Sequence, residues 1–216
     1  MFRKLIFVIV FYAISWAHAG SFEDFFKAIK QDDDRAIVVL LRRGFDVNTR
    51  DANGEHGLTM AIREPSFKAA AVLITARGIQ VEARNRQDES ALMLASLKGY
   101  LELAQQLIDK NADVNKPGWT PLHYASTHGH LAVMNLLLDN HAYIDASSPN
   151  GSTPLMMAAL YGTPSAVKLL LEGGADPLIK NGQALTAIDF ALRGERKESA
   201  EIISAFVRAR QPAGKW

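Results

Sequence analysis

Histidine and aspartate are the side chains of this chain that could bind a metal ion, and they gather in two places. His123, His128 and His130 lie close together, and imidazole is a common zinc ligand. A structural zinc site takes four protein ligands, however, and the 216-residue chain contains no cysteine to complete one. The acidic run Asp32–Asp34 precedes an apolar segment, where carboxylates suit the N-terminus of a helix. We therefore expect neither a metal site nor a cofactor.

Motifs for nucleophilic catalysis and for phosphate binding are absent from the sequence. The glycines form neither a P-loop nor a dinucleotide-binding fingerprint, and no serine has the context of a nucleophile elbow. The lack of cysteine excludes a catalytic thiol and disulfides. An enzyme would need polar groups that converge in a cleft, and His128 near Tyr161 is the one pair that we consider for such a role. A protein that is not an enzyme is the main expectation.

Composition and charge are those of an ordinary globular protein. The chain is 48% hydrophobic and 22% charged, and its formal net charge is +1. Its basic residues are interleaved with acidic ones, so there is no electrostatic footprint for nucleic acid and no general attraction to an anionic membrane. We therefore expect no nucleic-acid partner.

The first nineteen residues differ from the rest of the chain. Arg3 and Lys4 precede an apolar run over residues 5–16, and Ala17-His18-Ala19 places small residues where a signal peptidase reads them. This pattern predicts a signal peptide that is cleaved after Ala19, and hence a periplasmic or secreted protein. The run is shorter than the roughly 20 residues of a membrane span, so we expect no span after cleavage. An uncleaved anchor is the alternative.

A short motif recurs down the chain at a fixed interval. It reads TPLHYA at Thr120–Ala125, TPLMMA at Thr153–Ala158 and LTAIDFA at Leu185–Ala191, so that successive threonines are 33 residues apart. The threonine can cap a helix, and the proline after it fits the first helical position. Gly129 suits the left-handed conformation that ends a helix. The period predicts an all-α repeat solenoid of helix-turn-helix units joined by short β-hairpin turns.

Apolar residues in and around the best unit predict the core. The first helix of that unit contributes Leu122 and Ala125, and its second helix contributes Val133, Leu136, Leu137 and Leu138. The first unit of the chain is expected to contribute Phe26, Ile29, Val38, Leu40 and Leu41. One spacing is short, because Ser90 and Thr120 are 30 residues apart and the missing residues fall between Asn115 and Trp119. This shortening predicts a gap in the row of hairpins at Trp119.

The motif TPLHYASTHGH and the triplet Asp113–Asn115, echoed at Asp46–Asn48, resemble those of ankyrin-repeat proteins. The resemblance covers residues 21–209, and the chain is similar to small exported (periplasmic) bacterial ankyrin-repeat proteins. It implies that His123 and His130 are structural and bond between neighbouring turns. It also implies one ankyrin-repeat domain over residues 20–216. Its expected units are 22–54 (a cap), 55–88, 89–118, 119–151, 152–184 and 185–209 (a cap).

Ankyrin-repeat proteins usually bind other proteins on a concave face made of hairpin tips and the outer side of the first helices. Mapping that face onto this chain predicts one protein-binding surface. Its residues are Arg86, Glu89, Leu97, Lys98, Trp119, Thr127, His128, Leu160 and Tyr161. Aromatic and apolar side chains lie at its centre and charged ones around them, which is the usual composition of a binding hot spot. The alternative for Trp119 is that it packs against its own hairpin.

The predicted function is that of a non-catalytic, exported module that binds a partner protein, and we expect it to act as a monomer. The partner would be an envelope or secreted protein. Two roles remain open: an accessory or chaperone-like protein of the envelope, and a periplasmic immunity protein that inhibits a toxic effector. An enzyme with a site on the repeat stack is the remaining alternative.

Overall fold

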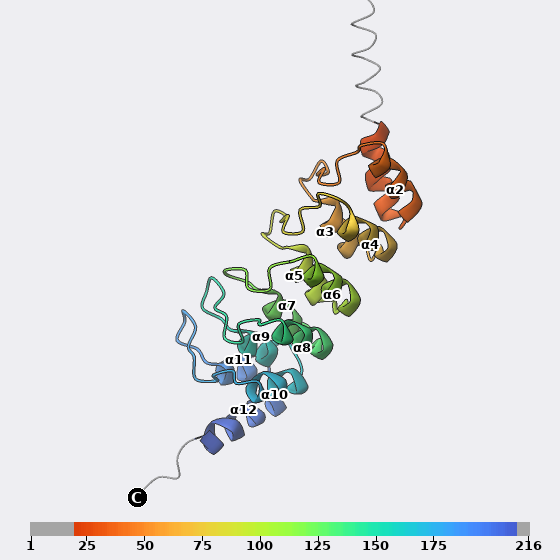
Figure 1. Ribbon diagram of the computed structural model, residues 1–216. Helices are drawn as coiled ribbons and strands as arrows, with labels where there is room; N and C mark the ends of the chain where they lie inside the picture. The colour runs from red at the N-terminus through yellow and green to blue at the C-terminus, as the bar shows by residue number, and fades with distance from the viewer. Residues whose placement is uncertain (1–19, 211–216) are drawn as a thin grey trace, which may run out of the picture. The chain divides into compact units, whose positions relative to one another are not determined.

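A computed structural model describes residues 20–210, and their regular structure is helical apart from one isolated antiparallel bridge between Arg50 and His56 (Figure 1). The helices form two compact units, which divide between Ala91 and Leu92. Within each unit the helices follow one another in pairs joined by short turns. The predicted fold class, an all-α repeat stack, is confirmed. The predicted signal peptide lies outside the described residues.

The helices between residues 34 and 193 are 7 to 9 residues long, whereas the helix that follows them has 14 residues. The first unit contains helical residues 20–30, α2 (Asp34–Arg42), α3 (Gly57–Arg63) and α4 (Phe67–Thr75). Helix α5 (Ala91–Lys98) begins at the division, and the second unit continues with α6 (Leu101–Asp109), α7 (Pro121–His128), α8 (Leu131–Asp139), α9 (Pro154–Leu160), α10 (Pro164–Glu172), α11 (Ala187–Arg193) and α12 (Lys197–Arg210). Within residues 20–210, no helix combines the length and the apolar character that crossing a membrane requires.

The repeated threonine starts three of the first helices in the way that the sequence predicts. In α7, the His123 amide donates to Thr120 Oγ1 at 3.4 Å, and the Thr120 amide donates to His123 Nδ1 at 3.1 Å. This capping box satisfies amides that have no partner within the helix. Helix α7 ends at Gly129, whose φ of 68° confirms the expected left-handed cap.

In the α7–α8 pair, the buried residues are those spaced at the helical period, and not every leucine of the run 136–138 is buried. Leu122, Ala125, Val133 and Leu137 are fully buried, as predicted. The predictions for Leu136 and Leu138 are wrong, because both are only half-buried. Met134 is fully buried instead. Positions 133, 134 and 137 share one face of the helix, whereas positions 136 and 138 lie on its flanks.

In helix α2, too, the buried face differs from the predicted one. Ile37 and Leu40 are buried, together with Ile29 of the preceding helix. Val38 and Leu41, which were predicted to lie in the core, are half-buried. They lie one position further around α2, so part of each side chain remains accessible.

Loops of successive repeats are joined by one recurrent side chain. Asn48 Oδ1 accepts from the Gln80 amide, and Asn48 Nδ2 donates to the Gly78 carbonyl. Asn115 makes the same two bonds within the second unit, to the Tyr143 amide and the His141 carbonyl, each at 2.8 Å. The asparagine therefore satisfies one backbone donor and one backbone acceptor of the next loop.

Asp145 occupies this position in the following repeat but provides only half of the pattern. Its carboxylate accepts from the Asp176 amide at 3.1 Å, and it has no hydrogen to donate. Burial raises the pKa of Asp145 above its ordinary value, and the nearby Asp176 carboxylate raises it further, against the effect of the amide bond. The ionised form is therefore penalised in the folded protein.

Replacing this carboxylate with an amide is expected to stabilise the protein. In Asp145→Asn, the new Nδ2 group should donate to the Gly174 carbonyl, which lies two residues before the capped amide, as Gly78 and His141 do. The expected gain at pH 7 is about 0.5–1.5 kcal/mol in the free energy of unfolding, measured by urea denaturation. The gain should shrink below the ordinary carboxyl pKa, where the aspartate is protonated in both states. The reverse change Asn115→Asp should destabilise the protein, and a destabilised Asp145→Asn variant would contradict the explanation.

Candidate protein-binding surface

The predicted surface residues of the second unit lie at the C-terminal ends of three first helices. Leu97 and Lys98 close α5, Thr127 and His128 close α7, and Leu160 closes α9 with Tyr161 as its cap. Lys98, His128 and Tyr161 are exposed, while Leu97, Thr127 and Leu160 are half-buried. Helices α7 and α9 pack against each other, and the repeat gives His128 and Tyr161 equivalent positions. We refer to these six residues as the helix-end surface.

Tyr161 is the most exposed aromatic residue of the helix-end surface. The residue is 55% accessible, whereas its backbone is held in place by neighbours. The Tyr161 carbonyl accepts from Arg196 at 3.2 Å, and the Tyr161 amide donates to the Met157 carbonyl. An aromatic ring on a fixed backbone loses little conformational freedom when it makes a contact.

His123 is a buried link between repeats and does not belong to any exposed site. Because its Nδ1 accepts from the Thr120 amide, the proton lies on Nε2, which donates to the Ser152 carbonyl at 2.9 Å. Burial lowers the pKa of His123 from 6.5 to about 4, so the ring is neutral at physiological pH. His130 makes a similar bond to the Leu97 carbonyl at 3.0 Å. The predicted structural roles of these two histidines are therefore confirmed.

His128 is the histidine that these bonds do not use. It is exposed, and its ring lies 5.7 Å from that of His130 between centroids. Within residues 20–210, no group of three or more histidine, aspartate, glutamate or cysteine side chains is arranged to hold a metal ion. Its position at the end of α7 leaves the imidazole available to a partner.

Trp119 combines a surface position with a packing role. The residue is half-buried, and its ring meets that of His123 edge to face, with centroids 5.2 Å apart. The shortened segment before it turns at Gly118, whose φ is 85°. Trp119 therefore packs on α7 near its capped start, and only part of the residue is available for contact.

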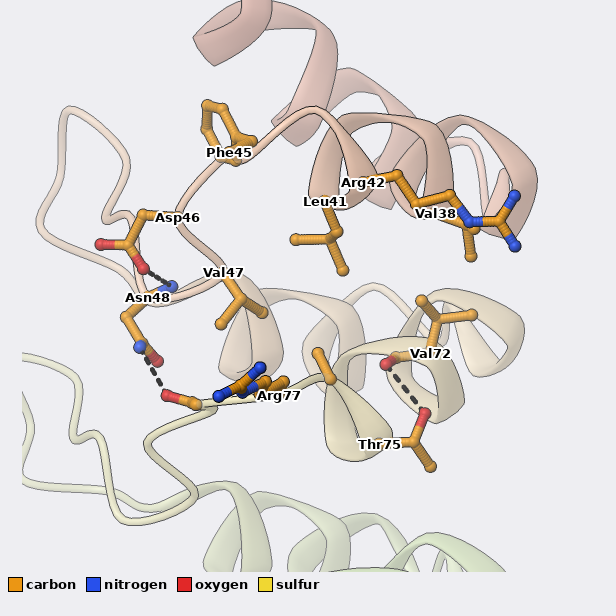
Figure 2. Close-up of a pocket in the computed structure, with 12 residues that line it drawn as sticks. Val38, Leu41, Arg42, Phe45, Asp46, Val47, Asn48, Val72, Thr75 and Arg77 are labelled. Carbon is orange, nitrogen blue, oxygen red and sulfur yellow. Dashed lines mark hydrogen bonds between the residues drawn. The ribbon is translucent and has the colours of Figure 1, made fainter.

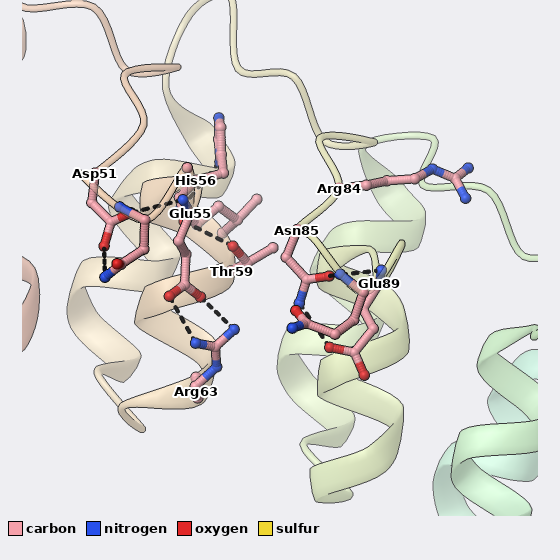
Figure 3. A network of polar contacts seen from close by, with 12 residues as sticks. Asp51, Glu55, His56, Thr59, Arg63, Arg84, Asn85 and Glu89 are labelled. Carbon is pink, nitrogen blue, oxygen red and sulfur yellow. Dashed lines mark hydrogen bonds and ion pairs between the residues drawn. The ribbon is translucent and has the colours of Figure 1, made fainter.

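Arg86 and Glu89 belong to the first unit, whereas the helix-end surface belongs to the second. Figure 3 shows that Glu89 lies against its own hairpin, where its Oε2 accepts from Asn85 Nδ2 at 2.7 Å. Asn85 Oδ1 in turn accepts from the amides of Gln87 and Glu89. Glu89 therefore shapes the hairpin, whereas Arg86 is exposed.

An ion pair in the same unit had no signal in the sequence. Arg63 Nη1 donates to Glu55 Oε2 at 2.7 Å, and Arg63 Nη2 lies 2.7 Å from Oε1 in an ion pair, although the residues are eight positions apart (Figure 3). Burial raises the pKa of Glu55, and the Arg63 guanidinium opposes this rise. Because the Glu55 side chain is only 11% accessible, the carboxylate depends on this one cation. A spacing that spans a hairpin and a helix cannot be recognised from helical periodicity alone.

Comparison with known proteins identifies the family. The chain matches the family described as ankyrin repeats, in three copies, over residues 25–117, 78–148 and 114–181. These matches cover well over half of the sequence. The chain belongs to the ankyrin-repeat family. This fold is typically a non-catalytic module that binds proteins.

Relatives of this ankyrin-repeat chain occur in bacteria and in animals. It is 28% identical to the putative ankyrin repeat protein YahD of Escherichia coli over 195 residues, covering 84% of this chain and 94% of YahD. It is 30% identical over 155 residues to the nuclear factor NF-kappa-B p105 subunit of Mus musculus, covering 68% of this chain. The chain spans only 16% of that subunit, so the likeness to p105 concerns its repeats alone.

Two solved bacterial structures resemble the stack closely. One is a chain of the complex between the predatory endopeptidase Bd0816 of Bdellovibrio bacteriovorus and its immunity protein Bd3460, with a TM-score of 0.73, 26% identity, and coverage of 84% of this chain and 97% of that chain. The other is an ankyrin repeat domain of Acinetobacter baumannii, with a TM-score of 0.74, 25% identity, and coverage of 85% and 97%. A protein of this fold is thus known in complex with a protein partner.

The neutral state of His123 predicts how stability varies with pH. Protonation of the ring is unfavourable in the folded protein, because its pKa there is about 4 instead of 6.5. The unfolded chain therefore binds more protons between these values, and stability should fall as the pH drops from 6.5 towards 4. Urea denaturation at pH 7 and pH 5 measures this loss.

A variant isolates the contribution of His123 to that loss. His123→Ala should destabilise the protein by about 1–3 kcal/mol at pH 7, because the Ser152 carbonyl loses its buried donor. Its further loss between pH 7 and pH 5 should be smaller than that of the native protein. An unchanged pH dependence would contradict the assignment. His128→Ala, at an exposed position, should change stability by less than about 0.5 kcal/mol at pH 7.

The Glu55–Arg63 pair predicts a second coupling. Arg63→Ala should lower stability by about 1–3 kcal/mol, because it leaves a largely buried carboxylate without its cation. Glu55→Gln in the same molecule should recover part of the loss, since the amide carries no charge. A double-mutant cycle by urea denaturation measures the coupling. If Arg63→Ala cost the same in the Glu55→Gln background as in the native protein, the two side chains would act independently.

Proposed function

We propose that this chain is an exported, non-catalytic module that binds a partner protein through the helix-end surface of its second unit. The observation that carries the proposal is the exposure of His128 and Tyr161 at equivalent positions of two helices that pack together. Half-buried apolar groups, Leu97 and Leu160, accompany them. Aromatic anchors beside apolar groups on a rigid scaffold are the usual basis of protein recognition.

Export rests on the N-terminal sequence. Residues 1–19 have the charge pattern, apolar run and small residues of a signal peptide, which favours a periplasmic or secreted location for the mature protein. The mass of the protein isolated from its own cells tests this proposal. A chain that begins at Gly20 supports cleavage, and an intact N-terminus in a membrane fraction would support the anchor instead.

Inhibition of a toxic enzyme is the second role, and one observation favours it. In the Bdellovibrio complex, the protein with a similar fold is an immunity protein, and it is bound to an endopeptidase. We propose that this chain acts in the same manner on a hydrolytic effector in the periplasm. An accessory role for another envelope protein uses the same surface but leaves the partner active. The activity of the captured partner, measured with and without an equimolar amount of this chain, separates the two roles.

The helix-end surface is tested by truncating its exposed anchors. His128→Ala with Tyr161→Ala should weaken partner binding by about 2 kcal/mol or more, equivalent to roughly 30-fold in the dissociation constant. Affinity capture from the native cells identifies the partner, and calorimetry with the purified partner measures the effect. The thermal midpoint should stay within about 2 °C, because neither side chain is buried.

A core variant provides the matched control. Leu137→Ala should lower stability by about 2–5 kcal/mol while leaving the surface unchanged, so binding below the unfolding transition should persist. Trp119 is tested separately, because its contact with His123 makes a loss of folding difficult to distinguish from a loss of binding. Full binding by the His128/Tyr161 double variant would exclude this surface as the contact site.

A further inference from the structure

A groove lies in the first unit, whereas the surface proposed for the protein partner belongs to the second. The groove has a volume of about 600 Å³ and runs between the C-terminal part of α2 and that of α4 (Figure 2). Its walls are largely aliphatic and aromatic. They include Val38, Leu41, Phe45, Val47 and Val72. This volume lies within the range of sites that take small ligands.

The groove is associated with an irregular end of one helix. Helix α2 closes with the Phe45 amide bonded to the Leu40 carbonyl, and α6, α8 and α10 close with the equivalent bond. Helix α4 instead ends at Thr75, with Ala76 in an extended conformation, and the chain turns at Gly78 with a φ of 79°. Ala76 and Gly78 of this segment line the groove together with Val38 and Leu41, which are half-buried.

Uncharged polar groups along the groove already have partners within the protein. Thr75 Oγ1 donates to the carbonyls of its own helix at Ala71 and Val72. Asn48 accepts from the Gln80 amide and donates to the Gly78 carbonyl. An incoming peptide backbone would find few free donors or acceptors here, and buried unpaired amides are costly. An alkyl chain carries no such groups.

Two cations at the groove remain unpaired. Arg42 comes from the last turn of α2 and Arg77 from the segment after α4, so they belong to opposite walls (Figure 2). Both are exposed, and neither guanidinium group makes an ion pair or hydrogen bond within the range 20–210. Both arginines also lie near the C-terminal end of a helix, where a cation is favourable. Asp46 is the one acidic residue that lines the groove, and its Oδ1 accepts from the Asn48 amide.

We propose that this groove is a binding site for a medium-chain aliphatic carboxylate. The alkyl chain lies against Val38, Leu41 and Val72, where it removes apolar surface from water. The carboxylate pairs with the guanidinium group of Arg42 or with that of Arg77, which lie apart in Figure 2 and are each suited to bidentate contact with carboxylate oxygens. Asp46 opposes the anion and moderates its affinity.

The proposal is tested by titrating decanoate into the ¹⁵N-labelled full chain, with decyltrimethylammonium as the matched cation. Decanoate should bind saturably with a dissociation constant on the order of 0.1–1 mM, given its size. The amide signals that shift should be those of residues 38–48 and 72–78. The cation, whose alkyl chain is one carbon longer, should bind at least about tenfold more weakly, because it meets two like charges.

Variants of the charged residues separate the proposed site from general adsorption of an alkyl chain. Arg42→Gln with Arg77→Gln should weaken decanoate binding about tenfold or more, and Arg35→Gln on the same helix, outside the groove, should not change it. Asp46→Asn should strengthen it, since the amide keeps the acceptor for Asn48 and removes the opposing charge.

Three results would overturn the proposal. They are an absence of saturable shifts, equal binding of the anion and the cation, and decanoate binding that the double arginine variant leaves unchanged. The outcome is independent of the helix-end surface, because the His128/Tyr161 double variant should bind decanoate as the native protein does.

Discussion

The hydrogen bond from His123 Nε2 to the Ser152 carbonyl is the interaction on which much of the second unit depends. The same imidazole caps the start of α7 through Nδ1, so one buried ring fixes both the beginning of a helix and the next hairpin. Such a bond requires a neutral ring and a fixed separation between repeats. It therefore sets the register in which α7 and α9 place His128 and Tyr161.

Close approach between neighbouring helices is the second constraint. A Cβ atom at Gly162 would lie 2.5 Å from the Ser126 carbonyl oxygen, so no other residue fits there without movement. Small residues such as Ala125 and Ala158 are fully buried at the same interface. The stack thus gains its stability from many short contacts between adjacent repeats, which is how repeat proteins without a single central core are stabilised.

The chain departs from its regular repeat at a few positions, and each of the two proposed sites lies near one of these irregular positions. The shortened segment before Trp119 precedes α7, which carries His128. The extended Ala76 at the end of α4 lines the groove in the first unit. A regular repeat gives every interface the same closed packing, so local departures from the period are what distinguish one surface from another. The family relationship therefore indicates a binding module, while these departures concern what it binds.

The sequence by itself determined the repeat and its caps, because periodicity and capping depend on residues close together in the chain. The structural roles of His123 and His130 followed from the resemblance to ankyrin repeats. The sequence also predicted the exposed positions of His128 and Tyr161, which follow from their place in the repeat. Only the tertiary structure decided that Leu136, Leu138, Val38 and Leu41 are half-buried, that Trp119 packs on His123, and that Glu55 pairs with Arg63. These features depend on the rotation of each helix and on how closely neighbouring repeats approach, and neither quantity is encoded in the local order of residues.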